Sequence, residues 1–236
     1  MKERILVKIS GGSLKSNNEI FDISKIQNLA YQIGVLSKKY RISLVVGGGN
    51  IFRGNLAKSL GLDRSDADSM GMLATIINGW VLSNAFTRQN IKTKIFSAIK
   101  MDKLIDEYTT RAVNESLDND YVCILVGGVG CPYFTTDTGA ALRAAETKSS
   151  LILMGKNGVD GVYDKDPIKY KNATRFDHLT YEEIISKSLD VIDQSALTLC
   201  WDNNINLLVF NINEENSLIK AINKEIKTTI INKEKD

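Results

Sequence analysis

The chain has 236 residues, of which 43% are hydrophobic, and its 30 basic and 28 acidic residues leave a formal net charge of +2. This near balance excludes the strong positive field with which nucleic-acid-binding proteins attract their partner, so any recognition of anions must be local. No apolar stretch approaches the ~20 residues of a membrane span, and the N-terminus runs into a predicted strand without a basic and apolar leader. We therefore expect a cytoplasmic protein that binds neither nucleic acid nor a membrane.

Apolar runs alternate along the chain with amphipathic segments of helix length, the pattern of a largely parallel sheet covered by helices on both faces. The predicted strands lie near residues 3–9, 42–46, 93–96, 121–126, 150–154 and 206–210. The predicted helices are Ser24–Tyr40, Ser69–Arg88, Thr110–Leu117, Thr138–Lys148, Tyr181–Ser186 and Ser195–Asn203. Asp160 to Tyr163 is typical of a turn between short strands. The fold class is thus α/β, a three-layer α/β/α sandwich in one continuous domain, 1–236.

Cysteine and histidine offer little for metal binding or acid–base catalysis. Cys123, Cys131 and Cys200 are odd in number and match no zinc or redox spacing, which indicates reduced thiols, with packing the favoured role for the first and last. The single histidine, His178, lies outside every glycine-rich segment, so we expect it to be structural.

Three of the predicted strands end in glycine-rich turns. These are Ser10-Gly11-Gly12, Gly47-Gly48-Gly49-Asn50 and Gly127-Gly128-Val129-Gly130. Backbone N–H groups in such turns, with the positive end of a following helix, form cradles for anions. Three cradles predict more than one phosphate group, although a run of glycines at a strand-to-helix corner is the structural alternative.

Charged and hydroxyl side chains accompany these turns. Lys8 precedes the first turn and could reach a phosphate held there, with a solvated edge lysine as an equal alternative. Arg53 follows the second turn, where a guanidinium group could bind phosphate oxygens in a bidentate manner. After the third turn, Thr135 and Thr136 supply hydroxyl donors, and Asp137 is the predicted N-cap of a helix.

The chain contains neither GxxxxGK[ST] nor a GxGxxG turn that opens a βαβ unit, and one histidine cannot supply a convincing catalytic triad. What remains is the positioning of anions by backbone, lysine and arginine. Phosphoryl transfer suits this set, because it depends on alignment and charge neutralisation more than on covalent chemistry.

Five motifs in this order resemble the bacterial UMP kinases of the amino acid kinase superfamily. They are Lys8 to Gly11, Gly47 to Asn50 with Phe52-Arg53-Gly54, Met70 to Thr75, Pro132 to Asp137, and Val159 to Tyr163 with Asp166-Pro167. The resemblance implies the amino acid kinase fold and in-line transfer of a phosphoryl group from ATP to UMP, giving UDP for pyrimidine nucleotide biosynthesis. It further implies a homohexamer, Mg²⁺ carried by ATP rather than held by protein ligands, and UTP as a candidate feedback inhibitor.

The resemblance also implies which residues bind each substrate, with an acceptor-binding lobe near 1–150 and an ATP-binding lobe near 151–236. Lys8 and Arg53 would be catalytic. ATP would meet Lys8, Ile9, Ser10, Gly11, Gly49, Arg53, Asn157, Tyr163 and Asp166. UMP would meet Gly48, Asp68, Val129, Gly130, Cys131, Pro132, Tyr133, Phe134, Thr135 and Thr136.

Several of these residues also have a plain structural interpretation. Asp68 could accept hydrogen bonds from ribose hydroxyls or cap the helix it precedes. Tyr163 could cover adenine or pack beside a turn, and Asp166 before a proline is commonly a turn residue. Asp193 could orient a lysine or a magnesium-bound water, with capping of the following helix at least as favoured.

Some positions depart from the family pattern. Gly12 stands where an acidic residue is usual, and Val129 and Cys131 replace the usual Thr and Asn, so any uracil contact at Val129 must come from the backbone. Residues 15–19 are short for the GTP-responsive loop of some members, which argues against GTP activation. Two rivals remain: a kinase of carbamate or an acidic amino acid, and a non-catalytic nucleotide-binding or oxyanion-storage relative.

Overall fold

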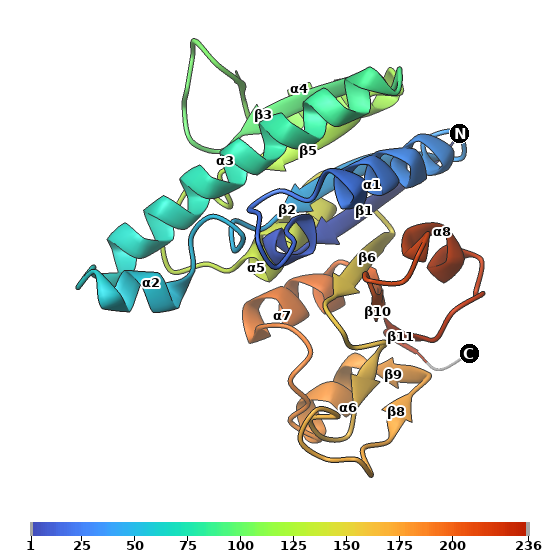
Figure 1. The fold of residues 1–236 in the computed structure, drawn as a ribbon. Coiled ribbons are helices and arrows are strands. Elements are labelled where there is room, and N and C mark those ends of the chain that lie inside the picture. The colour runs from blue at the N-terminus through green and yellow to red at the C-terminus, as the bar shows by residue number, and fades with distance from the viewer. Residues whose placement is uncertain (1, 235–236) are drawn as a thin grey trace.

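The computed structural model describes residues 2–234, which form a nine-stranded sheet between two layers of helices (Figure 1). In spatial order the strands are β4 (Asp106–Glu107), β3 (Thr93–Ser97), β5 (Val122–Val126), β2 (Tyr40–Val46), β1 (Glu3–Ile9), β6 (Leu151–Lys156), β10 (Asn206–Asn211), β11 (Thr228–Asn232) and β9 (His178–Thr180). Neighbouring strands are parallel except β10 and β11. The short strands β7 (Val162–Tyr163) and β8 (Arg175–Phe176) form a separate antiparallel pair.

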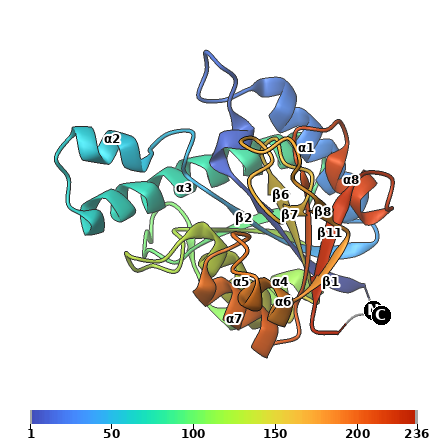
Figure 2. The same cartoon turned by 90° about the horizontal axis from the view of Figure 1, so that it is seen from below.

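The helices divide between the two faces of the sheet, as Figure 2 shows from below. One face packs on α1 (Ile23–Leu36), α3 (Arg64–Arg88) and α8 (Ser217–Ile222). The other packs on α4 (Thr110–Asp118), α5 (Thr136–Glu146), α6 (Tyr181–Ser186) and α7 (Gln194–Asp202). The short helix α2 (Gly54–Ser59) lies beside the start of α3, and a 3₁₀ turn (Gly11–Leu14) follows β1. None of the helices within residues 2–234 combines the length and apolar character needed to cross a bilayer.

Side chains of the central strand β1 alternate between the two faces, as the pleat of a strand requires. Ile5, Val7 and Ile9 enter the core beneath α1 and α3, whereas Leu6 enters the core on the side of α5. Burying each of these aliphatic side chains contributes about 1.5–3 kcal/mol relative to leaving it in water. By the same alternation Lys8 lies on the α5 side, and it is only 7% exposed, so the interpretation as a solvated edge lysine is wrong.

Strand register brings the three glycine-rich turns to one edge of the sheet. Ile9 of β1 lies opposite Val46 of β2 and Gly155 of β6, and all three strands run in the same direction. Because β5 is parallel to β2 as well, the turn after Val126 opens at the same edge. Ligands of open parallel sheets bind beyond the carboxyl ends of the strands, which is where these turns meet.

The expected α/β class with a mostly parallel sheet is confirmed, while two predicted helix starts are wrong. Helix α3 begins at Arg64 rather than Ser69, because its first turns are polar and carry no apolar stripe to signal them. Asp68 is therefore not its N-cap, a position that Asp63 occupies. Helix α5 begins at Thr136, and the Thr135 hydroxyl accepts the hydrogen bonds that we expected Asp137 to accept.

The sequence analysis missed α2, α8 and β11, and placed no strand at β4, β8 or β9. Each of these elements is too short to show a clear period, and α8 buries only Ser217, Leu218 and Ala221. The end predicted for α1 at Tyr40 is also wrong, since the helix stops at Leu36 and Tyr40 begins β2.

Candidate active site

The first two glycine-rich turns pack directly against each other. A Cβ on Gly11 would lie 2.5 Å from the Gly47 carbonyl oxygen and 2.6 Å from the Gly49 nitrogen, and a Cβ on Gly48 would lie 2.6 Å from the Gly71 oxygen. Gly11 and Gly48 are thus required by the chain's own packing. At Gly49 the nearest atom to an added Cβ is Arg53 Nε at 3.9 Å, so this glycine leaves open space.

Helix α3 fixes the second and third turns through two polar side chains. Asn78 is fully buried, and its Nδ2 donates to the Gly47 oxygen at 2.7 Å and to Asn50 Oδ1 at 2.7 Å. Thr75 Oγ1 accepts the N–H of Gly127 at 2.8 Å. Sequence reasoning assigned Asn78 no role, although two polar residues three apart in an otherwise apolar helical run were the available signal.

Glycine is needed in the third turn for its backbone conformation. Gly127, Gly128 and Gly130 have φ of +77°, +59° and +84°, a region that side-chain-bearing residues rarely adopt. This turn therefore differs from the first two, where close approach rather than positive φ requires glycine.

Lys8 forms a buried ion pair with the first turn of α5. Its Nζ lies 2.6 Å from Asp137 Oδ1, and the two side chains are 9% and 18% exposed. The helix N-terminus also favours the carboxylate. Asp137 is thus the partner that orients Lys8. The sequence predicted it only as the N-cap of the helix.

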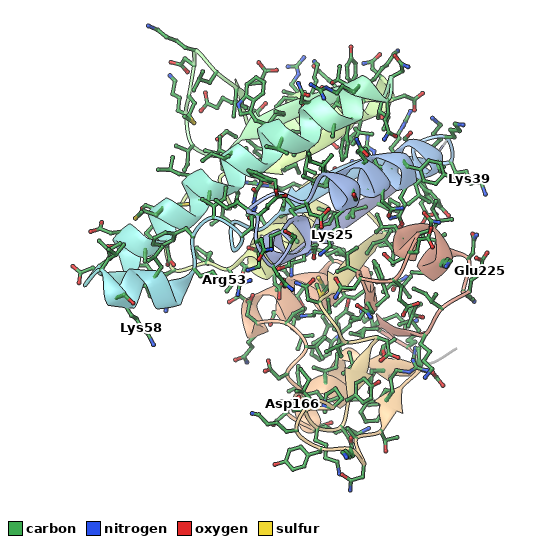
Figure 3. All side chains as sticks on the ribbon, viewed as in Figure 1. Lys25, Lys39, Arg53, Lys58, Asp166 and Glu225 are labelled. Carbon is green, nitrogen blue, oxygen red and sulfur yellow. The ribbon has the colours of Figure 1, made fainter. Side chains whose placement is uncertain are left out.

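Arg53 lies over the first turn. It occupies the N-cap position of α2, its Nε donates to the Gly49 carbonyl, and its Nη2 would be 3.2 Å from a Cβ on Gly12. Figure 3 shows Arg53 near the middle of the molecule, with Lys58 of α2 on one side and Lys25 of α1 on the other. Within residues 2–234 the guanidinium group forms no ion pair with a carboxylate. Its contacts with Gly49 and Gly12 place it at the edge where the turns meet.

A cavity of about 330 Å³ lies between the second and third turns. Among its lining residues are Gly48, Gly49, Phe52, Asp68, Met72, Thr75, Gly128, Val129, Cys131, Phe134, Thr135 and Thr136. The predicted residues Gly130, Pro132 and Tyr133 do not line it. We call this space the acceptor-side cavity.

A second cavity, of about 440 Å³, lies in the C-terminal half beside the β7–β8 pair. It brings Asn157, Tyr163 and Asp166 together, as expected, and adds Lys156. The Tyr163 hydroxyl donates to Asp160 Oδ1 at 2.5 Å, and this bond raises the pKa of the phenol. Asp166 Oδ1 accepts the N–H of Ile168 at 2.9 Å, which is the turn role expected for it. We call this space the donor-side cavity; Figure 3 labels Asp166, one of its lining residues.

Asn157 connects the donor-side cavity to the glycine-rich turns. It also lines an open hollow of about 460 Å³ together with Gly12 and Arg53. Its Oδ1 accepts a hydrogen bond from Ser13 Oγ at 2.9 Å. A ligand that begins beside Asn157 can therefore extend toward Arg53 without crossing the core.

Asp193 joins α7 to α5. Its Oδ1 caps α7 by accepting the Ala196 N–H at 3.0 Å and also accepts the Thr138 hydroxyl at 2.8 Å, while Thr135 donates to Oδ2. Burial opposes the charge of this carboxylate, but the hydrogen bonds from Thr135, Ala196 and Thr138 outweigh burial and lower its pKa. The expected cap is confirmed.

Nearby, Lys156 Nζ donates to the Val191 oxygen at 2.6 Å, and burial lowers the pKa of this lysine.

Two of the three thiols and the single imidazole do not line the acceptor-side cavity. Cys123 and Cys200 are buried, as expected, and burial raises the pKa of each thiol to about 12. Cys131 is exposed at the acceptor-side cavity. His178 pairs with Asn232 across β9 and β11 at 2.7 Å. Across residues 2–234, no three His, Cys, Asp or Glu side chains gather as a cation site.

The strand ends thus carry a buried lysine, an arginine and glycine-rich turns between two cavities, an arrangement that defines an α/β phosphotransferase. The sequence profile of the amino acid kinase family matches residues 3–211. Uridylate kinase of Ureaplasma parvum serovar 3 is 52% identical over 233 residues, which span 98% of this chain and 99% of that protein. Uridylate kinase of Malacoplasma penetrans is 48% identical over 236 residues, 100% of this chain and 74% of that protein.

Two crystal structures of UMP kinases share the fold. The enzyme from Ureaplasma parvum superposes with a TM-score of 0.97 at 52% identity, covering 99% of this chain and 100% of the other. The enzyme from Bacillus anthracis superposes with a TM-score of 0.93 at 35% identity, covering 99% and 97%. The chain belongs to the amino acid kinase family, among its uridylate kinases.

Proposed function

We propose that this protein phosphorylates UMP to UDP with ATP as the donor. The observation that carries the proposal is the placing of two cavities of nucleotide size at one sheet edge, with Lys8 and Arg53 at the turns between them. Similarity to uridylate kinases over the whole chain supports the same activity.

The donor-side cavity would hold the adenosine of ATP, between Tyr163 and Asp166 and against Asn157. The triphosphate would then pass along the hollow beside Arg53 and reach the first turn at Gly12, which lines that hollow. We assign to ATP the residues Lys8, Ile9, Ser10, Gly11, Gly49, Arg53, Asn157, Tyr163 and Asp166.

The acceptor-side cavity would hold UMP. Asp68 lines it and can accept hydrogen bonds from ribose hydroxyls. Val129 has no side-chain donor or acceptor, so uracil would be recognised through the backbone of the third turn. We assign to UMP the lining residues Gly48, Asp68, Val129, Cys131, Phe134, Thr135 and Thr136. The expected residues Gly130, Pro132 and Tyr133 lie outside this lining and belong to the loop that carries it.

Each cavity is lined by one part of the chain, which supports an acceptor-binding lobe near 1–150 and an ATP-binding lobe near 151–236. Residues 45–139 line the acceptor-side cavity, and residues 156–209 line the donor-side cavity. Lys8 and Arg53 belong to the first lobe and would reach the phosphates of the nucleotide bound by the second.

The transfer needs no general base, because a phosphate monoester with a second pKa of about 6 is largely dianionic at pH 7. An oxygen of the UMP phosphate forms a bond to the γ-phosphorus while the bond from that phosphorus to the β–γ bridging oxygen breaks, and ADP leaves. Repulsion between the two anions is the main obstacle. Lys8, Arg53 and the turn N–H groups would offset this repulsion and hold the γ-phosphate in line.

Mg²⁺ suits this site as an ion that arrives on the ATP phosphates. The Asp137 carboxylate is a hard oxygen donor of the kind Mg²⁺ prefers, but it is paired with Lys8, so the ion would take its ligands from the ATP phosphates and water. When bound, the ion neutralises phosphate charge.

We also propose a homohexamer in the cytoplasm, with UTP as a feedback inhibitor and little response to GTP. Large apolar side chains exposed on α1 and α3, Ile23, Tyr31, Ile77 and Trp80, support assembly through that face. Light scattering of the purified protein would give its mass, and a monomer in solution would contradict this assignment.

Measuring ADP release with UMP, CMP, AMP and dTMP as acceptors tests the activity. We expect turnover with UMP alone. A preference for another acceptor would refute the assignment of the acceptor-side cavity, and nucleotide binding without turnover would indicate a storage or sensing relative.

A further inference from the structure

The loop from Cys131 to Thr135 is pinned at its middle to the first turns of α3. The N–H of Tyr133 donates to Asp68 Oδ2 at 2.7 Å, and Arg64 Nη2 donates to the carbonyl oxygen of Tyr133 at 3.2 Å. Arg64 and Asp68 are one helical turn apart and form an ion pair at 3.5 Å. Both backbone polar groups of Tyr133 are therefore held by one pair of charged side chains.

The backbone conformation of Tyr133 also requires stabilisation by its surroundings. Its φ is +73°, a conformation that costs a bulky residue free energy and persists only when its surroundings impose it. The residue is 59% exposed, so the core does not anchor it. The Arg64 guanidinium carbon instead lies 5.0 Å from the ring centroid, a cation–π contact that adds to the backbone hydrogen bond.

The pinned loop forms one wall of the acceptor-side cavity. Cys131, Phe134 and Asp68 line this cavity, whereas Arg64 does not. Arg64 contacts Asp68 from outside the cavity and reaches the loop through Tyr133. Any movement of its guanidinium group would therefore shift both the carboxylate and the loop.

We propose that Arg64 is a positioning residue for the acceptor nucleotide: it fixes the Asp68 carboxylate and the Cys131–Thr135 loop in the geometry that receives UMP. This inference rests on the proposed function, which places UMP in that cavity. The role requires arginine, since a planar fork can pair with a carboxylate, donate to a carbonyl and lie on a ring at once, whereas a lysine ammonium is a point charge.

Kinetics of Arg64→Met test the proposal, with Arg111→Met as the matched control. Arg111 forms an ion pair of the same i,i+4 type with Glu115 at 2.9 Å on α4, and its side chain is 89% exposed. We expect Arg64→Met to raise the KM for UMP about fivefold, the factor that the loss of exposed ion-pair and cation–π contacts predicts. The KM for ATP and the melting temperature should stay at the wild-type values, as should every parameter of Arg111→Met. An unchanged KM for UMP, or an equal rise in both KM values, would overturn the proposal.

A double-mutant cycle with Tyr133→Leu examines the coupling between the two side chains. If Arg64 acts through Tyr133, the double variant should raise the KM for UMP less than the product of the single effects. Independent, multiplicative effects would contradict the mechanism.

Calorimetric titration of UMP into wild type and Arg64→Met separates this inference from the proposed function. If the wild type binds UMP about fivefold more tightly than the variant but transfers no phosphoryl group, Arg64 keeps its role and the kinase assignment fails. If both bind UMP equally, the role of Arg64 fails while the kinase assignment stands. A wild type that binds no UMP overturns both.

Discussion

Replacing Lys8 with methionine separates its structural role from its chemical one. The substitution keeps most of the length of the side chain but leaves the Asp137 carboxylate, which is 18% exposed, without its partner. Breaking a fully buried pair costs about 3–5 kcal/mol, so we expect the lower end here, about 3 kcal/mol. At roughly 2–4 °C per kcal/mol for a chain of this size, the melting temperature should fall by about 6–12 °C.

The double variant Lys8→Met/Asp137→Asn removes both charges and should recover most of this stability. Its phosphoryl transfer should remain slow. If Lys8 stabilises charge in the transition state as one preorganised donor does, its loss costs about 2–4 kcal/mol, or roughly 30- to 1000-fold in kcat. Arg53→Ala should cause a similar loss of rate with little change in stability, because Arg53 is exposed.

Single-turnover transfer from ATP to UMP and thermal unfolding, measured on the same samples, provide the two readouts. A Lys8→Met enzyme whose transfer rate stays within a few-fold of the wild type would refute the catalytic role. Recovery of activity in the double variant would show that Lys8 serves only to neutralise Asp137.

Three further predictions concern the turns, the thiols and a half-buried phenol. Gly11→Ala should abolish ATP binding in a titration, because its Cβ would lie 2.5 Å from the Gly47 oxygen; ATP affinity at the wild-type level would contradict this. At pH 8, a thiol reagent should modify Cys131 and spare the two buried cysteines, whose pKa of about 12 leaves almost no thiolate, and UMP should slow the reaction. Burial, with a hydrogen bond to Glu146, raises the pKa of Tyr108 to about 12, so its stabilising contribution is complete below pH 10 and is lost between about pH 10 and 12. Denaturant unfolding should show this loss in the wild type and not in Tyr108→Phe.

The site could be predicted from the sequence where its signals are local. Apolar β-branched runs that break into glycine mark the strand ends at Ile9, Val46 and Val126, and the structure places these ends at one edge of the sheet. Lys8 was a candidate because it lies at the end of the first strand, directly before a glycine-rich turn. The spacing of apolar residues and the residue types of a turn depend only on neighbouring residues. The strand ends predicted from these local signals are confirmed.

What the sequence could not show depends on contacts between distant segments. Thr135 caps α5, which leaves the Asp137 carboxylate free to pair with Lys8. Nothing in the sequence around Asp137 indicates this pairing. Asn78 reaches Gly47 only once α3 packs on the sheet. Likewise, the close approach of Gly11 to the second turn exists only in the assembled sheet.

The central place of β1 has a consequence for synthesis on the ribosome. This strand precedes the others of the sheet in the sequence, yet it pairs with β2 on one side and with β6, residues Leu151–Lys156, on the other. While the first half emerges, β1 can be only the edge of a partial sheet, with its backbone N–H and C=O groups open along one side. Such an edge can pair with another chain, so the nascent protein carries an aggregation-prone edge until β6 emerges. The strand that carries Lys8 thus has both of its neighbours only after about two thirds of these 236 residues have been made.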